Sequence, residues 1–251
     1  MSFLSKLGIG GTREERDSRS VAKLQKKVVE KYGPPENRQG AIEELGELAQ
    51  SGSEAAIDAL LMRYTIRIDP GITDDDERAR VHALIIQARN ASLPSLKKFV
   101  LTRDEIAWPL RALNEILPEE EVLKFLLEVL GKSAAEYSRV PEKKVLLLHA
   151  LAAHKHAPGA TTAALPFLED MDDEVQIAAA QAIAAQADDA GREPVIQLLL
   201  RAHSVSNARV REAVAGLLAD SAWDVKGYTP SVEAALPPAY KLDKAGKVVR
   251  K

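Results

Sequence analysis

Apolar residues recur along this chain at positions i, i+3, i+4, i+7 and i+8, the spacing that places them on one face of a helix. Complete copies of this pattern are Val175, Ala178, Ala179, Ala182 and Ile183, and Val210, Ala213, Val214, Leu217 and Leu218. Partial copies are Val81, Leu84, Ile85 and Ala88, then Ala41, Leu45, Leu48 and Ala49, and a looser one that begins at Val145 and Leu148. An irregular copy over 104–117 has Pro109 near its start. The pattern predicts a series of helices, each with one buried face.

A second, more compact apolar pattern follows most of these segments, as in Ile57-x-x-Leu60-Leu61 and Val195-x-x-Leu198-Leu199. It predicts a second set of helices over 54–67, 93–102, 119–130, 162–170 and 191–203. A further helix over 19–32 should end at Gly33-Pro34-Pro35, because this sequence breaks helices. The chain therefore consists of helical hairpins.

Residues typical of helix starts show that the hairpins recur at a regular interval along the chain. Pro141 suits a first helical turn, and four polar residues stand where N-caps are expected, namely Asp74, Asp104, Asp172 and Asn207. With first helices starting near 37, 74, 104, 141, 172 and 207, the spacing is 30 to 37 residues. Such a period is typical of an α-solenoid, in which a repeat buries its apolar face only against its neighbours. We expect an all-α superhelix of about five to six hairpins.

The two ends of the chain depart from the pattern. Residues 1–18 read as a flexible leader, in which Phe3, Leu4 and Leu7 would share one side of a short helix able to dock on a partner or a membrane surface. Residues 19–221 form the repeat region. Residues 222–251 read as a cap over the last repeat, with a small β-hairpin around residues 243–246.

Two repeat copies point to a known family. The segment DMDDEVQIAAAQAIAAQADDAGREPVIQLLL has an Asp-rich turn, a Val and paired alanines, and SNARVREAVAGLLAD repeats the layout with a Val-Arg pair. Both resemble the HEAT-repeat consensus, although Gln176 replaces the expected Arg. The resemblance extends over residues 141–221 and, more faintly, over 37–131. It implies an armadillo-like α-solenoid and, most often, a protein-binding scaffold.

Composition narrows the function further. The 251 residues include no cysteine, which excludes disulfides and thiolate metal sites and fits a cytoplasmic location. No apolar run is long enough to cross a bilayer. Residues 1–31 carry eight Lys/Arg against four Asp/Glu and residues 223–251 carry six against three, which leaves 20 against 30 between them. Because this middle region is acidic, we expect no nucleic-acid partner.

HEAT-like families that are enzymes suggest alternative functions for this chain. Iron-binding deoxyhypusine hydroxylases use His-Glu dipeptides, which this chain lacks, so we expect no metal or cofactor. HEAT-like DNA glycosylases use Trp, Asp and Arg on a basic face, and Trp108 and Trp223 would be candidates here. Bilin-lyase-like proteins, which handle linear tetrapyrroles, carry similar repeats. The acidic run Asp74–Glu77 lacks the ligand spacing of an EF-hand, and an acidic N-terminal turn that complements the helix dipole explains it.

The preferred interpretation is a non-catalytic adaptor that holds a protein on the concave face of the solenoid. In HEAT-like arrays the second helices line this face. The positions before and one turn after their apolar doublets predict a mildly basic strip that binds an acidic or helical protein segment. The strip consists of Arg63, Lys97, Lys98, Lys124, Gln197 and Arg201.

Overall fold

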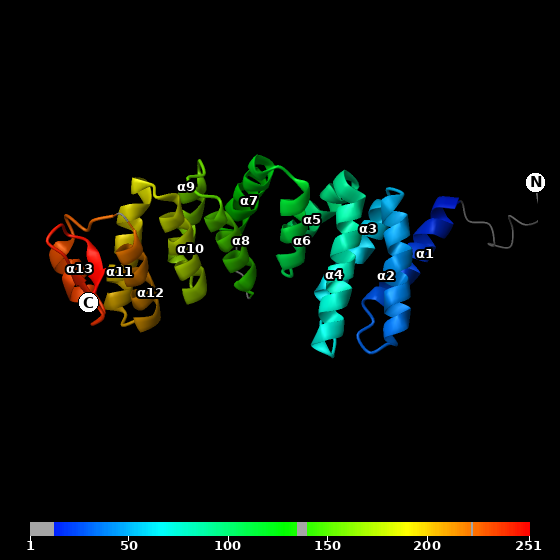
Figure 1. The fold of residues 1–251 in the computed structure, drawn as a ribbon, viewed down its shortest axis with the longest axis horizontal. Helices are drawn as coiled ribbons and strands as arrows, with labels where there is room; N and C mark the ends of the chain where they lie inside the picture. The colour runs from blue at the N-terminus through cyan, green and yellow to red at the C-terminus, as the bar shows by residue number, and fades with distance from the viewer. Residues whose placement is uncertain (1–12, 135–139, 222) are drawn as a thin grey trace, which may run out of the picture. The chain divides into compact units, whose positions relative to one another are not determined.

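The computed structural model describes residues 13–134, 140–221 and 223–251, with side chains from Ser18 onward. These residues are mostly α-helical and include one two-stranded antiparallel sheet, which confirms the all-α class (Figure 1). The chain divides into two compact units, residues 1–118 and 119–251. Within the described residues, no helix has the length and apolar character that crossing a bilayer requires.

Unit 1 has two layers of helices. Helices α2 (Pro35–Gln50), α4 (Gly71–Ala88) and α6 (Ala107–Ile116) pack on one another in chain order and form the first layer. The second layer consists of α1 (Arg13–Val28), α3 (Glu54–Leu61) and α5 (Leu93–Thr102), again in chain order. Two 3-10 turns, η2 (Met62–Thr65) and η3 (Arg89–Ser92), follow α3 and α4. The hairpins of unit 1 therefore stack side by side.

Unit 2 repeats this arrangement. Its first layer is α8 (Glu142–Ala153), α10 (Asp173–Gln186) and α12 (Ala208–Asp220). Its second layer is α7 (Glu119–Ser133), α9 (Ala160–Ala164) with η4 (Leu165–Glu169), α11 (Arg192–Ser204) and α13 (Thr229–Ala235). The turn η5 (Asp189–Gly191) leads into α11. Each layer again brings together helices that alternate along the chain.

The buried faces follow the predicted apolar pattern closely in α10 and less closely elsewhere. All five predicted residues of α10 are buried. In α12, Val210, Val214 and Leu218 are buried, whereas Ala213 and Leu217 are only half-buried. In α8, Lys144 is buried and the neighbouring Val145 is half-buried, and the Lys144 ammonium lies 2.8 Å from Asp170. An ion pair therefore takes the place of an apolar contact at the start of α8.

Two of the predicted N-caps are confirmed. The Asp172 carboxylate accepts hydrogen bonds from the amides of Glu174 and Val175, and the Asn207 side chain accepts one from Val210. Asp74 and Asp104 are wrong predictions, because α4 begins at Gly71 and α6 at Ala107. Their cap positions are Pro70 and Ile106, and neither offers a side-chain acceptor.

At the N-terminal end, α1 begins at Arg13, six residues before the predicted start and inside the predicted leader. Phe3, Leu4 and Leu7 lie outside the described residues. At the other end, strands β1 (Tyr240–Leu242) and β2 (Val248–Arg250) pair antiparallel, which confirms the predicted hairpin. Strand β2 packs on α12 and helix α13 packs on α11, so the last segment covers both layers of unit 2.

The alanines of α10 provide a test of this packing. Ala179 and Ala182 are fully buried, so replacing either with Leu should force overpacking and lower the free energy of unfolding by about 1–3 kcal/mol. Urea unfolding measures the change, with Gln181→Leu on the exposed face of α10 as the control. Equal stability of the Ala179→Leu variant and the Gln181→Leu variant would contradict the packing.

Candidate functional site

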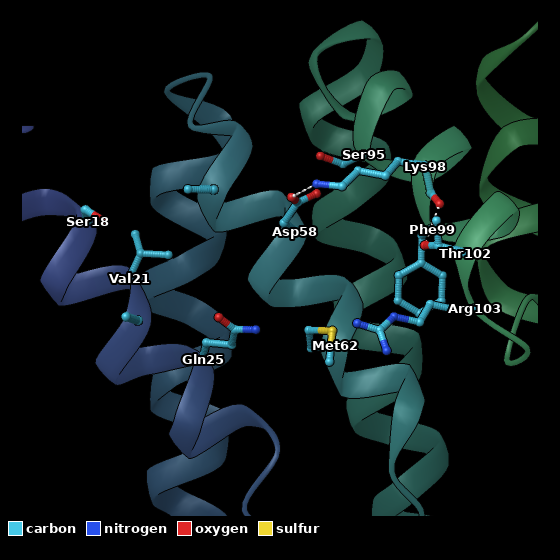
Figure 2. A pocket seen from close by; sticks show the side chains of 12 residues that line it. Ser18, Val21, Gln25, Asp58, Met62, Ser95, Lys98, Phe99, Thr102 and Arg103 are labelled. Atoms are coloured by element: carbon cyan, nitrogen blue, oxygen red, sulfur yellow. Dashed lines mark hydrogen bonds and ion pairs between the residues drawn. The ribbon is translucent and has the colours of Figure 1, made fainter.

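A groove lies across the second layer of unit 1, between α1, α3 and α5 (Figure 2). Its volume is about 360 Å³, within the range of small-ligand pockets and large enough for a few side chains of a partner. We call it the inner groove and define it by the residues that line it. These are Ser18, Val21, Ala22, Gln25, Ala55, Asp58, Met62, Ser95, Lys98, Phe99, Thr102 and Arg103.

The floor of the inner groove is apolar. Val21 and Phe99 are buried to 7% and 6% exposure, and Met62 is half-buried. Ala22 and Ala55, on the facing helices α1 and α3, are exposed and carry only a methyl group. Because these two side chains are so short, the surface between α1 and α3 is hollow.

An ion pair spans one end of the inner groove. The Lys98 ammonium on α5 donates a hydrogen bond of 2.8 Å to the Asp58 carboxylate on α3 (Figure 2). This hydrogen bond, together with the Asp58 charge, raises the pKa of Lys98 above its ordinary value. Lys98 is therefore a cation at neutral pH, and its charge is balanced by Asp58.

The other end of the inner groove has a cation without an ion-pair partner among the described residues. Arg103 follows the last residue of α5, and Figure 2 shows its guanidinium group pointing across the groove toward Met62. Arg103 is exposed, and its side chain forms no ion pair or hydrogen bond with any residue that the structure describes. The amide of Gln25 points into the same space from α1. Among the described residues, the inner groove thus offers one unbalanced positive charge next to an apolar floor.

The predicted basic strip is divided between the two units. In unit 1, Lys98 lines the inner groove and Lys97 is half-buried beside it on α5. Unit 2 carries Lys124, Gln197 and Arg201, of which Lys124 and Gln197 are exposed. Arg201 is half-buried and donates hydrogen bonds to the Glu169 carboxylate and the Leu168 carbonyl. The charges of Lys98 and Arg201 are thus balanced by acidic neighbours, which sequence spacing alone did not indicate.

The prediction that Arg63 lies on an exposed strip is wrong, because its side chain is fully buried. Its Nε donates a 2.7 Å hydrogen bond to Glu77, and its Nη2 donates one of 2.7 Å to Asp74. Arg38 also donates to Glu77 at 2.7 Å, and the Arg78 guanidinium lies 2.8 Å from Asp74. These five buried side chains form an ionic cluster that joins α2, η2 and α4.

The ionic cluster positions the floor of the inner groove. Arg63 belongs to η2 and points toward the first layer, where it donates hydrogen bonds to Glu77 and Asp74 on α4. Met62, the preceding residue of η2, lines the inner groove on the opposite side. Anchoring Arg63 in the first layer therefore fixes the backbone that carries Met62.

The sequence did contain a signal for this cluster. The sequence predicts an acidic N-terminal turn at Asp74–Glu77, and Asp74 does lie in the first turn of α4. Asp75 and Asp76 are exposed there, whereas Asp74 and Glu77 are buried. Shifting the apolar pattern that begins at Val81 back by seven residues places its first three positions on Asp74, Glu77 and Arg78. Charged residues at three positions of one buried face require partners. Arg38 and Arg63 bind Glu77, Arg63 also binds Asp74, and Arg78 pairs with Asp74.

The tryptophan and histidine side chains that the sequence offers as candidates contact neighbouring side chains of the fold. Trp108 stacks on Tyr64 with ring centroids 6.0 Å apart and lies 5.5 Å from the His82 ring. His82 itself lies 3.0 Å from the Glu115 carboxylate, and His154 lies 3.1 Å from Glu119. Among the described residues, no group of three or more His, Cys, Asp or Glu side chains is placed to hold a metal ion.

Comparison with known proteins gives no relative for this chain. No protein-family model, no curated protein and no solved structure matches it. The resemblance to HEAT repeats therefore stays a prediction, and the site is interpreted from its own geometry.

The buried ionic cluster leads to a first prediction about this site. Arg63→Ala leaves Glu77 and Asp74 with fewer partners in a buried environment, and loss of one member of a buried ion pair costs about 3–5 kcal/mol. The control is Arg67→Ala, since Arg67 approaches Asp74 at 3.5 Å but its side chain is 78% exposed. Its loss should cost at most about 1 kcal/mol. Chemical denaturation compares the two, and equal losses would show that the cluster does not stabilise unit 1.

Acid pH should weaken the same cluster. Burial alone would raise the pKa of Asp74, but the hydrogen bond from Arg63 and the charges of Arg78 and Arg63 outweigh it and lower the pKa below its ordinary value of 3.8. The ionised carboxylate therefore stabilises the folded state above pH 3.8, and this stabilisation is lost as the pH falls through the lower folded pKa. The free energy of unfolding should decrease less in Asp74→Asn than in the exposed control Asp75→Asn when the pH is lowered from about 6 to 3. Parallel curves would contradict this role of Asp74.

Proposed function

We propose that this protein is a HEAT-like solenoid that acts as a non-catalytic scaffold or adaptor, and that it holds a protein partner on its second-layer helices. The observation that carries the proposal is the inner groove. It combines an apolar floor, a hollow formed by two alanines and an unbalanced cation on a single face of three neighbouring helices. Concave apolar surfaces with a few polar groups are the usual form of a binding site.

The layered packing supports the HEAT-like part of the proposal. In each unit, alternate helices contact one another in chain order, as in repeat proteins whose repeats contact mainly their neighbours. Such arrays present one layer of helices as an extended binding surface. The inner groove lies on the layer of α1, α3 and α5. The resemblance to HEAT repeats implies partner binding on the second helices of the hairpins, which in this layer are α3 and α5.

The chemistry of the groove supports binding more than catalysis. A general base needs an unprotonated group near the operating pH. The Asp58 carboxylate in the groove is already bound by the Lys98 ammonium at 2.8 Å, and the Arg103 guanidinium stays protonated at any ordinary pH. This guanidinium is suited to hydrogen bonds with an acidic group. The proposal includes a cytoplasmic location, which fits a chain without cysteine.

Site-specific photocrosslinking in the native host tests the proposal. A photoreactive phenylalanine analogue at Thr102, on the exposed rim of the inner groove, should give a protein adduct of defined mass. The matched control places the same analogue at Glu44, which is exposed on α2 in the first layer and should give little adduct.

Equal adducts at Thr102 and Glu44, or adducts at neither position, would contradict binding on the second layer. The enzymatic alternatives predict different results. A chromophore that absorbs visible light in the purified protein, or salt-dependent DNA binding, would favour a bilin-lyase-like or glycosylase-like protein instead.

A further inference from the structure

We infer that the inner groove of unit 1 recognises a short peptide segment that carries a carboxylate next to a large apolar side chain. The carboxylate binds the Arg103 guanidinium, and the apolar side chain packs on Met62 and Phe99. This inference rests on the proposed function and specifies the partner segment that the site selects.

The charged side chains that line the inner groove determine the sign of the charge that the partner must carry there. Three of the described side chains that line it are charged, and two of these, Asp58 and Lys98, are paired with each other at 2.8 Å. Arg103 is the remaining one, with no ion-pair partner among the described residues. The acidic residues that follow it, Asp104 and Glu105, do not line the groove. The complementary group is therefore a single anion, and a carboxylate accepts two parallel hydrogen bonds from a guanidinium.

The apolar floor of the groove determines which kind of side chain the partner places on it. Met62, Phe99 and Arg103 line the same groove, and in Figure 2 the Arg103 guanidinium points toward Met62. A thioether side chain adapts to different apolar shapes, and an aromatic ring provides a large apolar contact. Because the volume is about 360 Å³, the groove holds a few side chains and not a whole domain. A short segment with one apolar anchor is the size of ligand that fits.

A buried hydroxyl in the same groove has an open hydrogen-bonding position. Ser95 is 1% exposed, and its Oγ forms no hydrogen bond with any described residue. It lines the groove at the end that the Asp58–Lys98 pair spans. Buried hydroxyls are normally hydrogen-bonded, so this one indicates a ligand atom that the folded chain does not supply. A main-chain carbonyl of the bound segment would accept this hydrogen bond.

The test uses a phage-displayed library of random 12-residue peptides, selected on the full-length protein. Enriched peptides should share an Asp or Glu adjacent to Leu, Met or Phe. Synthetic copies of them should bind Arg103→Glu about tenfold more weakly, as loss of a charge-assisted hydrogen bond predicts. Lys23→Glu is the matched control, because Lys23 is exposed on α1 and does not line the groove.

A charge exchange separates direct contact from a loss of folding. Peptides in which the shared Asp or Glu is replaced with Lys should bind Arg103→Glu more tightly than they bind the native protein. Thermal melting by circular dichroism should give the same midpoint for Arg103→Glu and Lys23→Glu, since both residues are exposed.

Three outcomes would overturn the inference. They are enriched peptides without an acidic residue, peptides that bind Arg103→Glu and Lys23→Glu equally well, and a selection that enriches no peptide. In each case the photocrosslinking at Thr102 decides separately whether the protein binds partners on its second layer. A protein adduct there would leave the proposed function standing with a different partner chemistry.

Discussion

The burial of Arg63 is the interaction on which the geometry of unit 1 depends. A guanidinium with no exposed surface requires compensating charge, and α4 supplies it through Asp74 and Glu77. Because both carboxylates belong to the first layer, the turn that carries Arg63 is bound to that layer. Met62 then has to face the opposite side, where the inner groove lies. The function that we propose for the groove therefore depends on an ionic cluster that no partner would touch.

Buried ion pairs of this kind contribute little net stability compared with apolar residues of the same size. They differ from apolar contacts in being directional, because a guanidinium binds its acceptors only in fixed positions. The core of α10 shows the alternative, since small buried alanines fill most of its packed face. In unit 1, directional contacts join three elements at one point. This difference suits a region that has to hold a surface side chain in place.

Local sequence signals predicted the helices well, since each of them depends on neighbouring residues. The caps at Asp172 and Asn207 and the hairpin from Tyr240 were predicted because each signal lies within the element that it starts. The candidate site was predicted only in part. Lys98 is exposed, as its position before the apolar doublet predicts, but its pairing with Asp58, 40 residues away, depends on the stacking of α3 and α5. Arg63 was misplaced for the same reason, since its partners belong to another hairpin.

The central claim is that the ionic cluster fixes the inner groove, and a distance measurement tests it most directly. Spin labels at Ser18 on α1 and Thr102 on α5 lie on the two sides of the groove. Pulsed electron paramagnetic resonance should give one narrow distance distribution in the native protein and a broader one after Arg63→Ala. The Arg67→Ala variant should give the same narrow distribution as the native protein. The same narrow distribution in all three proteins would contradict the claim, since the groove would then keep its shape without the cluster.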